Sequence, residues 1–393
     1  MKVLRKIKEE KGSITMTVVA AMLFITSTIL IAYFSLSNQS NDQSKKIRQI
    51  ADSYKVTNSE LIQKYKEVQD NLSDSNIITI TAGQKSPVNS NAQYKSGNYK
   101  AIIPAGFTVS NEPGETSIET GLVIRDDDGN EFVWIPVGIP WKSDPSKTIT
   151  LSRYTFDTNG VPEDKGANTI DYYYTESSSS SYENAVAKTD VTSANGFIAK
   201  TNAAGGFWIG RYEARTTSEA ARSSNSDPLT SVTEKPGNAV YDYIKQTDAS
   251  TKSREMYNEN EYFESDLINS YAWDTATLFL QEYDNRTNAV KGNSNYKTKY
   301  SRQIRLSSGL KNTGTNASGI ADANKDKICN VYDMADNCWE WSTETSRDLD
   351  LPCVLRGGFY NGYSNVYTSS RSSGNDTGSD HVSFRPLLYV MQN

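Results

Sequence analysis

The alternation of apolar and polar positions divides the chain into a long helical segment, a polar linker and a larger mixed domain. Residues 14–33 are mostly apolar, which is about the length that a helix needs to cross a bilayer. From 38 to 75, apolar residues fall mostly at helical steps between Lys, Arg, Glu and Gln, which predicts an amphipathic stalk helix. Residues 76–98 hold a run rich in Gly, Ser, Asn and Pro and predict a linker, so a globular domain is expected at 99–393.

Within the globular domain, short apolar runs between turn residues predict strands. The strands are expected at 102–109, 120–125 and 132–137, with the acidic turn 126–130 before the last of them. We interpret this turn as a solvated hairpin tip rather than a calcium loop, because no bidentate glutamate stands at EF-hand spacing. Apolar residues at helical spacing predict a helix between 265 and 283 with its tryptophan in the core, and a second helix is expected at 239–246.

Three blocks near the C-terminus carry the most distinctive pattern. Cys329–Trp341 reads CNVYDMADNCWEW, Leu355–Phe359 reads LRGGF, and His381–Arg385 reads HVSFR. Together they resemble the closing half of the formylglycine-generating enzyme (sulfatase-modifying factor) family, a branch of the C-type lectin fold. Residues 132–137 and 205–213 resemble the opening strands of that family. The resemblance implies an α+β, C-type-lectin-like domain with twisted antiparallel sheets and much irregular loop, here preceded by a long N-terminal helix.

The chemistry of that family is not expected to carry over. In its oxidising enzymes, a cysteine pair between the Arg-Gly-Gly block and the final Phe-Arg binds copper and attacks the substrate thiol. Here residues 359–371 contain no cysteine. Without a thiolate pair there is neither a Cu(I) site nor a nucleophile, so we expect no copper and no catalysis. The single histidine, His381, is assigned a structural role in a closing strand.

The same resemblance implies a structural calcium site in the central block. The ligands would be the side chain of Asp333, the backbone carbonyls of Asp336 and Cys338, and the carboxylate of Glu340. Carboxylates and carbonyls are the oxygen ligands that Ca²⁺ takes. The alternative is that these acids are hydrogen-bonded loop carboxylates with no metal.

Three cysteines leave at least one unpaired. A disulfide between Cys329 and Cys353 would close a loop around the expected metal turn, as an exported location allows, while Cys338 lies next to Trp339 in the expected core. The alternative is three buried thiols.

Ligand binding is expected on 359–370 and 372–380, where tyrosine and asparagine alternate with small residues. The alternative is a tyrosine-rich edge of the core. The bias also resembles the variable region of proteins diversified by diversity-generating retroelements, which use a lectin-type scaffold. The expected contacts are Phe359, Tyr360, Asn361, Tyr363, Asn365, Tyr367, Arg371, Asn375 and Asp376.

The N-terminal residues predict where in the cell the protein is located. Residues 1–12 form a basic leader, and 13–37 are expected to cross a membrane once, with the N-terminus cytoplasmic and the C-terminal domain extracellular. A cleaved signal peptide, a plain signal anchor and a helix resembling type IV pilin precursors cut after Gly12 are the three alternatives. Thr17 stands where pilins usually have glutamate, which counts against filament assembly. The stalk helix would associate with itself, with pilins or with the globular domain.

Composition narrows the partners. The formal charge of −6 and the pI near 5.2 argue against a nucleic-acid-binding surface. We therefore expect a non-catalytic surface protein of the adhesin or receptor type, anchored in a membrane or associated with a pilus, that binds a protein, a peptide or a glycan. The alternatives are a copper-dependent formylglycine-type oxidase and a minor pilin with a structural role.

Overall fold

The computed structural model describes the C-terminal four-fifths of the chain with gaps. The described residues are 77–157, 160–166, 174–175, 191–192, 196–217, 222–236, 238–284, 327–335, 337–359 and 368–391. The basic leader 1–12, the predicted membrane segment 13–37 and the predicted stalk helix 38–75 lie outside the described residues.

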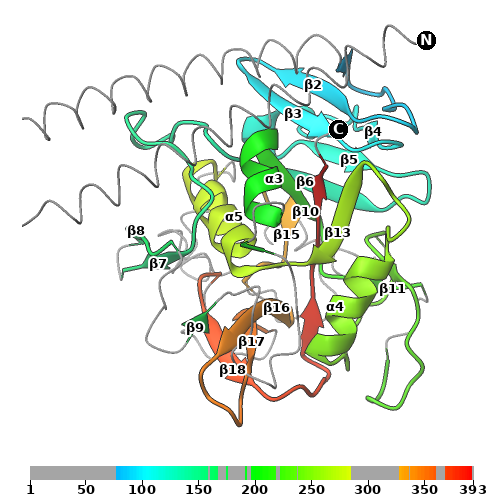
Figure 1. The fold of residues 1–393 in the computed structure, drawn as a ribbon, viewed down its shortest axis with the longest axis vertical. Coiled ribbons are helices and arrows are strands. Elements are labelled where there is room, and N and C mark those ends of the chain that lie inside the picture. Colours follow the sequence, from blue (N-terminus) through cyan, green and yellow to red (C-terminus); the bar gives the residue numbers. More distant parts are fainter. Residues whose placement is uncertain are drawn as a thin grey trace, which may run out of the picture. The chain divides into compact units, whose positions relative to one another are not determined.

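A six-stranded antiparallel sheet forms the centre of the domain. Its strand order is β13-β20-β10-β6-β5-β4, and Figure 1 shows β6, β10, β20 and β13 side by side. Because β20 pairs with both β10 and β13, this late strand lies inside a sheet whose other members include β4, β5 and β6 from early in the domain. The strands are β4 (Thr108–Val109), β5 (Val123–Arg125), β6 (Glu131–Pro136), β10 (Gly206–Gly210), β13 (Phe263–Leu267) and β20 (Pro386–Val390).

Apolar side chains cover both faces of this sheet. Successive residues of a strand point to opposite faces, so Val133 and Ile135 enter one core while Phe132 and Trp134 enter another. This explains why the run 132–137 is apolar without alternation, as a strand buried on both faces requires. Trp134 lies opposite Trp208 of β10, and their ring centroids are 5.0 Å apart.

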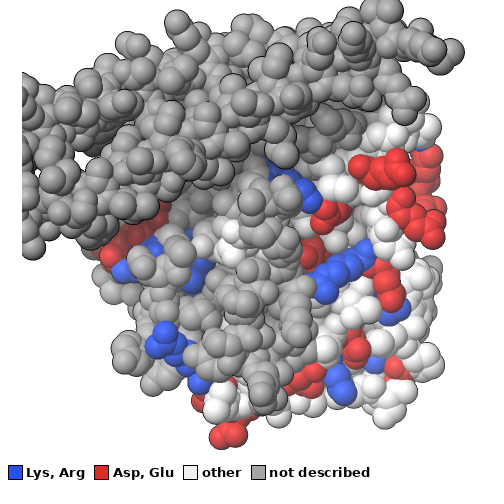
Figure 2. Space-filling view, viewed as in Figure 1, with Lys and Arg blue, Asp and Glu red and all other residues white. Residues whose placement is uncertain are grey.

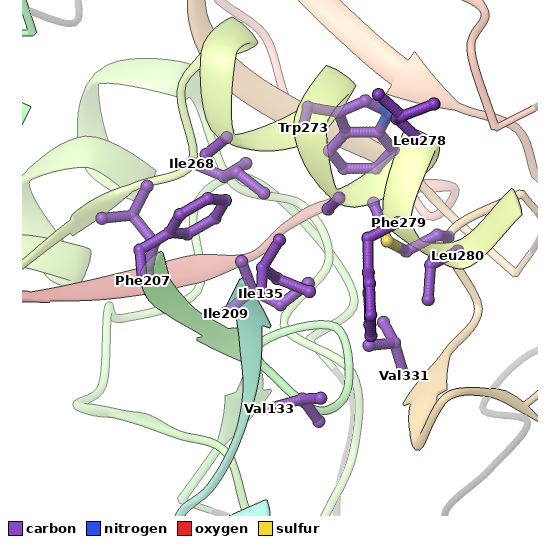
Figure 3. Packing of buried hydrophobic residues seen from close by; sticks show 14 of the residues in the cluster. Val133, Ile135, Phe207, Ile209, Ile268, Trp273, Leu278, Phe279, Leu280 and Val331 are labelled. Carbon is purple, nitrogen blue, oxygen red and sulfur yellow. The ribbon is translucent and has the colours of Figure 1, made fainter. Parts of the chain in front are cut away.

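Helix α5 (Ser270–Glu282) fills the first core. Asn269 caps its N-terminus by accepting a hydrogen bond from the backbone N–H of Ala272. Trp273, Leu278 and Phe279 of this helix belong to the same apolar cluster as Phe207 and Ile209 of β10, and Figure 3 shows Phe279 beside Val331. The helix predicted between 265 and 283 is therefore confirmed, and so is the core position of its tryptophan.

The other two α-helices among the described residues are short. They are α3 (Phe197–Ala204) and α4 (Gln246–Glu255). The helix predicted at 239–246 is wrong in position, because α4 begins where that segment ends.

A second sheet brings the three C-terminal blocks together. Its order is β18-β17-β16-β19, with β9 also paired to β16. The first residue of β16, Trp339, lies opposite Gly357 of β17 and Val382 of β19. The central block, the LRGGF block and the HVSFR block are thus neighbours on one sheet. Its strands are β9 (Tyr174–Thr175), β16 (Trp339–Ser346), β17 (Cys353–Gly357), β18 (Arg371–Gly374) and β19 (Val382–Phe384).

Smaller ribbons complete the domain. They are the sheet of β1 (Ile78–Ile80), β2 (Ala92–Ser96) and β3 (Tyr99–Ile103), and the pairs β7 (Tyr154–Phe156) with β8 (Pro162–Asp164), β11 (Arg215–Thr216) with β12 (Val232–Thr233), and β14 (Lys327–Ile328) with β15 (Val331–Tyr332). A 3-10 turn, η1 (Ile118–Thr120), precedes β5. Strands β1 and β2 lie inside the segment that the sequence predicts as a linker, and Ala92 and Tyr94 are buried in the second core.

Two predictions need correction. The α+β class with a long N-terminal helix is wrong for the described residues, in which strands predominate over helices and the three α-helices have 8, 10 and 13 residues. The reason is that polar, turn-rich sequence between the motifs folds into short ribbons rather than helices. The predicted transmembrane helix and single-pass membrane location are corrected by a second finding. In the part of the chain that the structure describes, no helix combines the length and the apolar character needed to cross a bilayer.

Candidate functional site

Four of the nine predicted ligand contacts belong to the described residues. These are Phe359, Arg371, Asn375 and Asp376, whereas Tyr360, Asn361, Tyr363, Asn365 and Tyr367 fall in the segment 360–367, outside the described part. The geometry of the site is therefore built from the residues that flank this segment.

Three half-buried aromatic side chains meet where the second sheet ends. The ring centroids of Phe359 and His381 are 4.8 Å apart, and those of Trp339 and Phe359 are 6.3 Å apart. We call Trp339, Phe359 and His381 the aromatic group. Each ring comes from a different block, and each is only partly covered. The rings are within the range in which aromatic pairs stabilise one another beyond their area burial.

Strand pairing places the aromatic group. The backbone N–H of Trp339 donates to the carbonyl of His381 at 2.8 Å, which fixes the start of β16 beside the residue before β19. Trp341, two residues on and on the same face of β16, is fully buried, and its indole N–H donates to the carbonyl of Ile244. Trp339 is the outermost residue of the same row and therefore stays partly exposed.

A carboxylate lies beside the aromatic group. Asp380 Oδ1 is 2.9 Å from His381 Nδ1, and the two side chains are 45% and 39% exposed. The imidazole thus combines a ring face against Phe359 with a polar edge toward Asp380. The sequence predicts a structural role for His381 and a core position for Trp339, so neither was a predicted ligand contact. The signal that was available is that both residues flank strand ends in the recognisable blocks.

Hydrogen bonds from buried side chains hold the far end of the segment that follows Phe359. The indole N–H of Trp273 donates to the carbonyl of Thr368 at 2.7 Å, and Arg356 Nε donates to the carbonyl of Ser370 at 3.0 Å. The guanidinium of Arg356 also lies 5.4 Å from the centroid of the Trp273 ring. Both ends of the segment 359–370 are thus held by contacts: Phe359 packs against Trp339 and His381, and the carbonyls of Thr368 and Ser370 accept hydrogen bonds from Trp273 and Arg356.

Arg356 also belongs to a network of five buried charges, which we call the arginine network. It contains Arg153, Arg356, Arg371, Asp274 and Glu344. Arg356 pairs with Asp274 at 2.6 Å and with Glu344 at 3.3 Å, and Arg371 pairs with Glu344 at 3.0 Å and with Asp274. Burial by itself raises the pKa of Glu344, but the positive charges of Arg371, Arg153 and Arg356 outweigh it and lower the pKa to about 2.

Two of the predicted ligand contacts are engaged inside the fold instead. The side chain of Arg371 is only 5% exposed, because it belongs to the arginine network. Asp376 accepts hydrogen bonds from the backbone N–H and the hydroxyl of Thr247, in the first turn of α4. A carboxylate at that place satisfies a helix N-terminal donor and interacts favourably with the helix dipole. Asn375 is exposed, and its Oδ1 accepts from the hydroxyl of Thr377.

The predicted calcium ligands are only partly assembled. Both oxygens of the buried Glu340 carboxylate accept from Arg385, at 2.7 and 3.0 Å. The backbone N–H of Cys338 donates to Glu213 Oε1 at 2.8 Å. Asp333 is buried nearby. Burial raises the pKa of the Glu213 carboxyl most, and the charges of Glu340 and then Asp333 raise it further. A guanidinium already neutralises Glu340, so a cation would have to compete with it.

The remaining ligand, Asp336, lies outside the described residues. Within the described ranges, no group of three or more His, Cys, Asp or Glu side chains is arranged to hold a metal ion. Calcium therefore stays a prediction of the family resemblance.

The expected disulfide does not form. Cys329 lies in the β14–β15 turn within the first core, and its thiol donates to the carbonyl of Tyr283. Cys353 opens β17 in a separate cluster beside Trp341. Because the two residues belong to different cores, all three cysteines are present as buried thiols. Burial, with a smaller contribution from Asp376, raises the pKa of Cys353 to about 12.

Comparisons with known proteins add little. No family model matches the chain, and no curated protein matches it. One similar solved structure is that of CarF, which is 15% identical over 38% of this chain and 67% of CarF, with a TM-score of 0.25. A likeness of that size carries no argument about fold or function. The resemblance to the formylglycine-generating enzymes remains a prediction from the three blocks.

Proposed function

We propose that the domain is a non-catalytic ligand-binding domain whose ligand contacts the aromatic group and the segment that follows Phe359. The observation that carries the proposal is the contact of Trp339 and His381 with Phe359, three half-buried rings from three blocks, beside the half-exposed Asp380. Aromatic side chains dominate binding energetics because they bring a large contact area at a low entropy cost.

Buried side chains hold the residues at the far end of the segment that follows Phe359. A binding loop gains affinity when its ends are held by packed residues rather than ordered on binding. Trp273 and Arg356 hold the far end, and Arg356 is itself fixed by Asp274 and Glu344. In this proposal the arginine network is a positioning element and makes no contact with the ligand.

The ligand class follows from charge. Figure 2 shows Lys and Arg side chains scattered among Asp and Glu on the described part of the face drawn, and the formal charge of the chain is −6. Nucleic acid would require a continuous basic surface. An aromatic group with one adjacent carboxylate instead suits a protein, a peptide or a glycan, which offer apolar faces together with hydrogen-bond donors.

The proposal is tested by substituting the aromatic group. The full-length chain is screened on arrays of immobilised peptides and glycans, and the affinity for each hit is compared with that of Trp339→Ala and Phe359→Ala. Loss of a central aromatic contact costs about 2 kcal/mol or more, so each variant is expected to bind about 30-fold more weakly. The matched control is Trp141→Ala, which removes a half-buried tryptophan from another part of the domain. Equal binding by Trp339→Ala and Trp141→Ala, both folded by circular dichroism, would refute the proposal.

Oxidation of a substrate cysteine is the rival function, and it makes a different prediction. Cys329, Cys338 and Cys353 are buried, and a thiol with a pKa of about 12 is protonated at neutral pH. With Cu(I) and a cysteine-containing peptide, the purified chain is therefore expected to consume no oxygen above the buffer rate in an oxygen electrode. Copper-dependent consumption that is lost when one of these cysteines is replaced by serine would establish the enzyme instead.

A further inference from the structure

A cavity of about 360 Å³ lies apart from the aromatic group, between the acidic turn, strand β12 and the end of helix α4. This volume is within the range of small-molecule sites, at its lower end. The residues that line it come from four segments of the chain. They are Asp126, Asp128, Asn130, Thr217, Ser231, Val232, Thr233, Lys235, Lys252, Glu255, Met256 and Tyr257.

The acidic turn is held in place by its own hydrogen bonds. The Asp126 carboxylate accepts from the backbone N–H of Asn130 at 2.8 Å, from the Asn130 side-chain amide at 2.6 Å and from the Tyr257 hydroxyl at 2.6 Å. The Thr233 hydroxyl donates to Asn130 Oδ1 at 2.7 Å, which ties the turn to β12. The cavity is thus preformed, and the charge of Asp126 is already satisfied.

Two oppositely charged side chains of the cavity lining are available to contact a ligand. Lys252 pairs with Glu255 at 2.8 Å, which leaves the exposed Asp128 and the half-buried Lys235. Neither takes part in an ion pair among the described residues. The stem of Lys235 lies over Gly129, since its Cε is 3.6 Å from the place that a Cβ on Gly129 would occupy. One acceptor and one donor of full charge therefore flank the same turn.

The rest of the lining adds apolar surface. Val232 is buried, and Met256 and Tyr257 are half-buried. A ligand that suits this lining carries a positive group, a negative group and an apolar side chain within a short span.

We propose that this cavity binds a small zwitterion of the α-amino acid type. Asp128 pairs with its ammonium group, Lys235 pairs with its carboxylate, and the side chain of the ligand contacts Val232 and Met256. This function is independent of the aromatic group.

Three probes that differ only in charge test the proposal. L-Leucine, N-acetyl-L-leucine and L-leucinamide are titrated into the full-length chain at pH 7, with binding followed by calorimetry. Loss of a hydrogen bond to a charged group costs about tenfold in affinity or more, so both blocked forms are expected to bind at least that much more weakly than leucine. Equal binding of either blocked form, or no saturable binding of leucine up to about 10 mM, overturns the proposal.

Variants of the turn locate the site. Asp128→Asn and Lys235→Gln are each expected to weaken leucine binding about tenfold or more. The matched control is Asp127→Asn, because Asp127 lies in the same turn but pairs with Lys85 and does not line the cavity. Wild-type affinity in Asp128→Asn, or an equal loss in Asp127→Asn, contradicts the assignment. Trp339→Ala should leave leucine binding unchanged, so that failure here is separable from failure of the proposed function.

Discussion

At the scale of single residues, Glu344 is a buried carboxylate whose charge is compensated by three arginines. Its carboxylate is fully buried and accepts hydrogen bonds from Arg153, Arg356 and Arg371. With Asp274, the network holds three positive and two negative charges away from water. Such a network is stable only if every member is present, since removal of one partner leaves an uncompensated buried charge.

The lowered pKa of Glu344 predicts a loss of stability in acid. Above pH 4.5 the carboxyl is ionised in both the folded and the unfolded chain, and its contribution is complete. As the pH falls from 4.5 to 2, the unfolded chain takes up the proton first, so the free energy of unfolding is expected to fall by about 3 kcal/mol on account of this group. Urea unfolding between pH 5 and 2 measures this slope.

Variants separate this group from other carboxylates. Glu344→Gln should lose that part of the slope, whereas Glu112→Gln, an exposed matched control, should retain it. Glu344→Gln is also expected to be less stable than the wild type at pH 7, by about 3–5 kcal/mol. If it does not fold, the Glu344 carboxyl of the wild type is titrated by NMR, and a midpoint near 4.5 would contradict the prediction.

At the scale of elements, the turn between β14 and β15 is held against η1. Asn330 Nδ2 donates to the carbonyls of Gly114 and Gly121, at 2.8 and 2.6 Å. Gly121 ends η1 with a φ of +88°, and a Cβ there would lie 1.7 Å from the carbonyl oxygen of Cys329. The backbone of one element thus occupies the space that a side chain on the other would need.

Gly121→Ala is expected to destabilise the domain strongly. The substitution combines a left-handed backbone with a clash against another backbone, which cannot rotate away as a side chain does. Gly97→Ala is the matched control, because Gly97 also has a positive φ, +61°, but its Cβ would meet no atom within 4 Å. Denaturant unfolding should show a loss larger for Gly121→Ala by about 2 kcal/mol or more. Equal losses would mean that the turn moves aside at little cost.

Helix α4 shows why one element was misplaced from sequence. Its buried positions, Gln246, Ala249, Ser250 and Ser253, do follow the spacing of a helix face. They are small or polar, however, so a search for apolar periodicity passes over them. Helix α5 was found because its buried face is made of Trp273, Leu278 and other large apolar residues.

At the scale of the whole molecule, the redox state of the cysteines tests whether Cys329 and Cys353 lie in separate cores. Because Cys329 and Cys353 belong to different clusters, a reducing agent is expected to leave the melting temperature unchanged within about 1 °C. A thiol reagent should label none of the three cysteines in the native protein and all three after unfolding in urea. A melting temperature that falls by several degrees on reduction, or fewer than three reactive thiols in urea, would indicate a bridge.

The sequence by itself determined the local features of this protein. The apolar run 132–137 gave β6, helical spacing gave α5, and the absence of cysteine in 359–371 is a fact of composition. Each of these features depends on residues that are close together in the sequence, and such local patterns can be read directly from the order of apolar and polar residues.

Only the tertiary structure decided which polar residues lie inside and which rings meet. Arg371 and Asp376 read as ligand contacts in the sequence, but partners more than ninety residues away hold them in the fold. Trp339, Phe359 and His381 meet because β16 pairs with both β17 and β19. A charged side chain is buried at low cost only where opposite charges compensate it, and here the packing of helix α5 against the strands brings those charges together from distant segments.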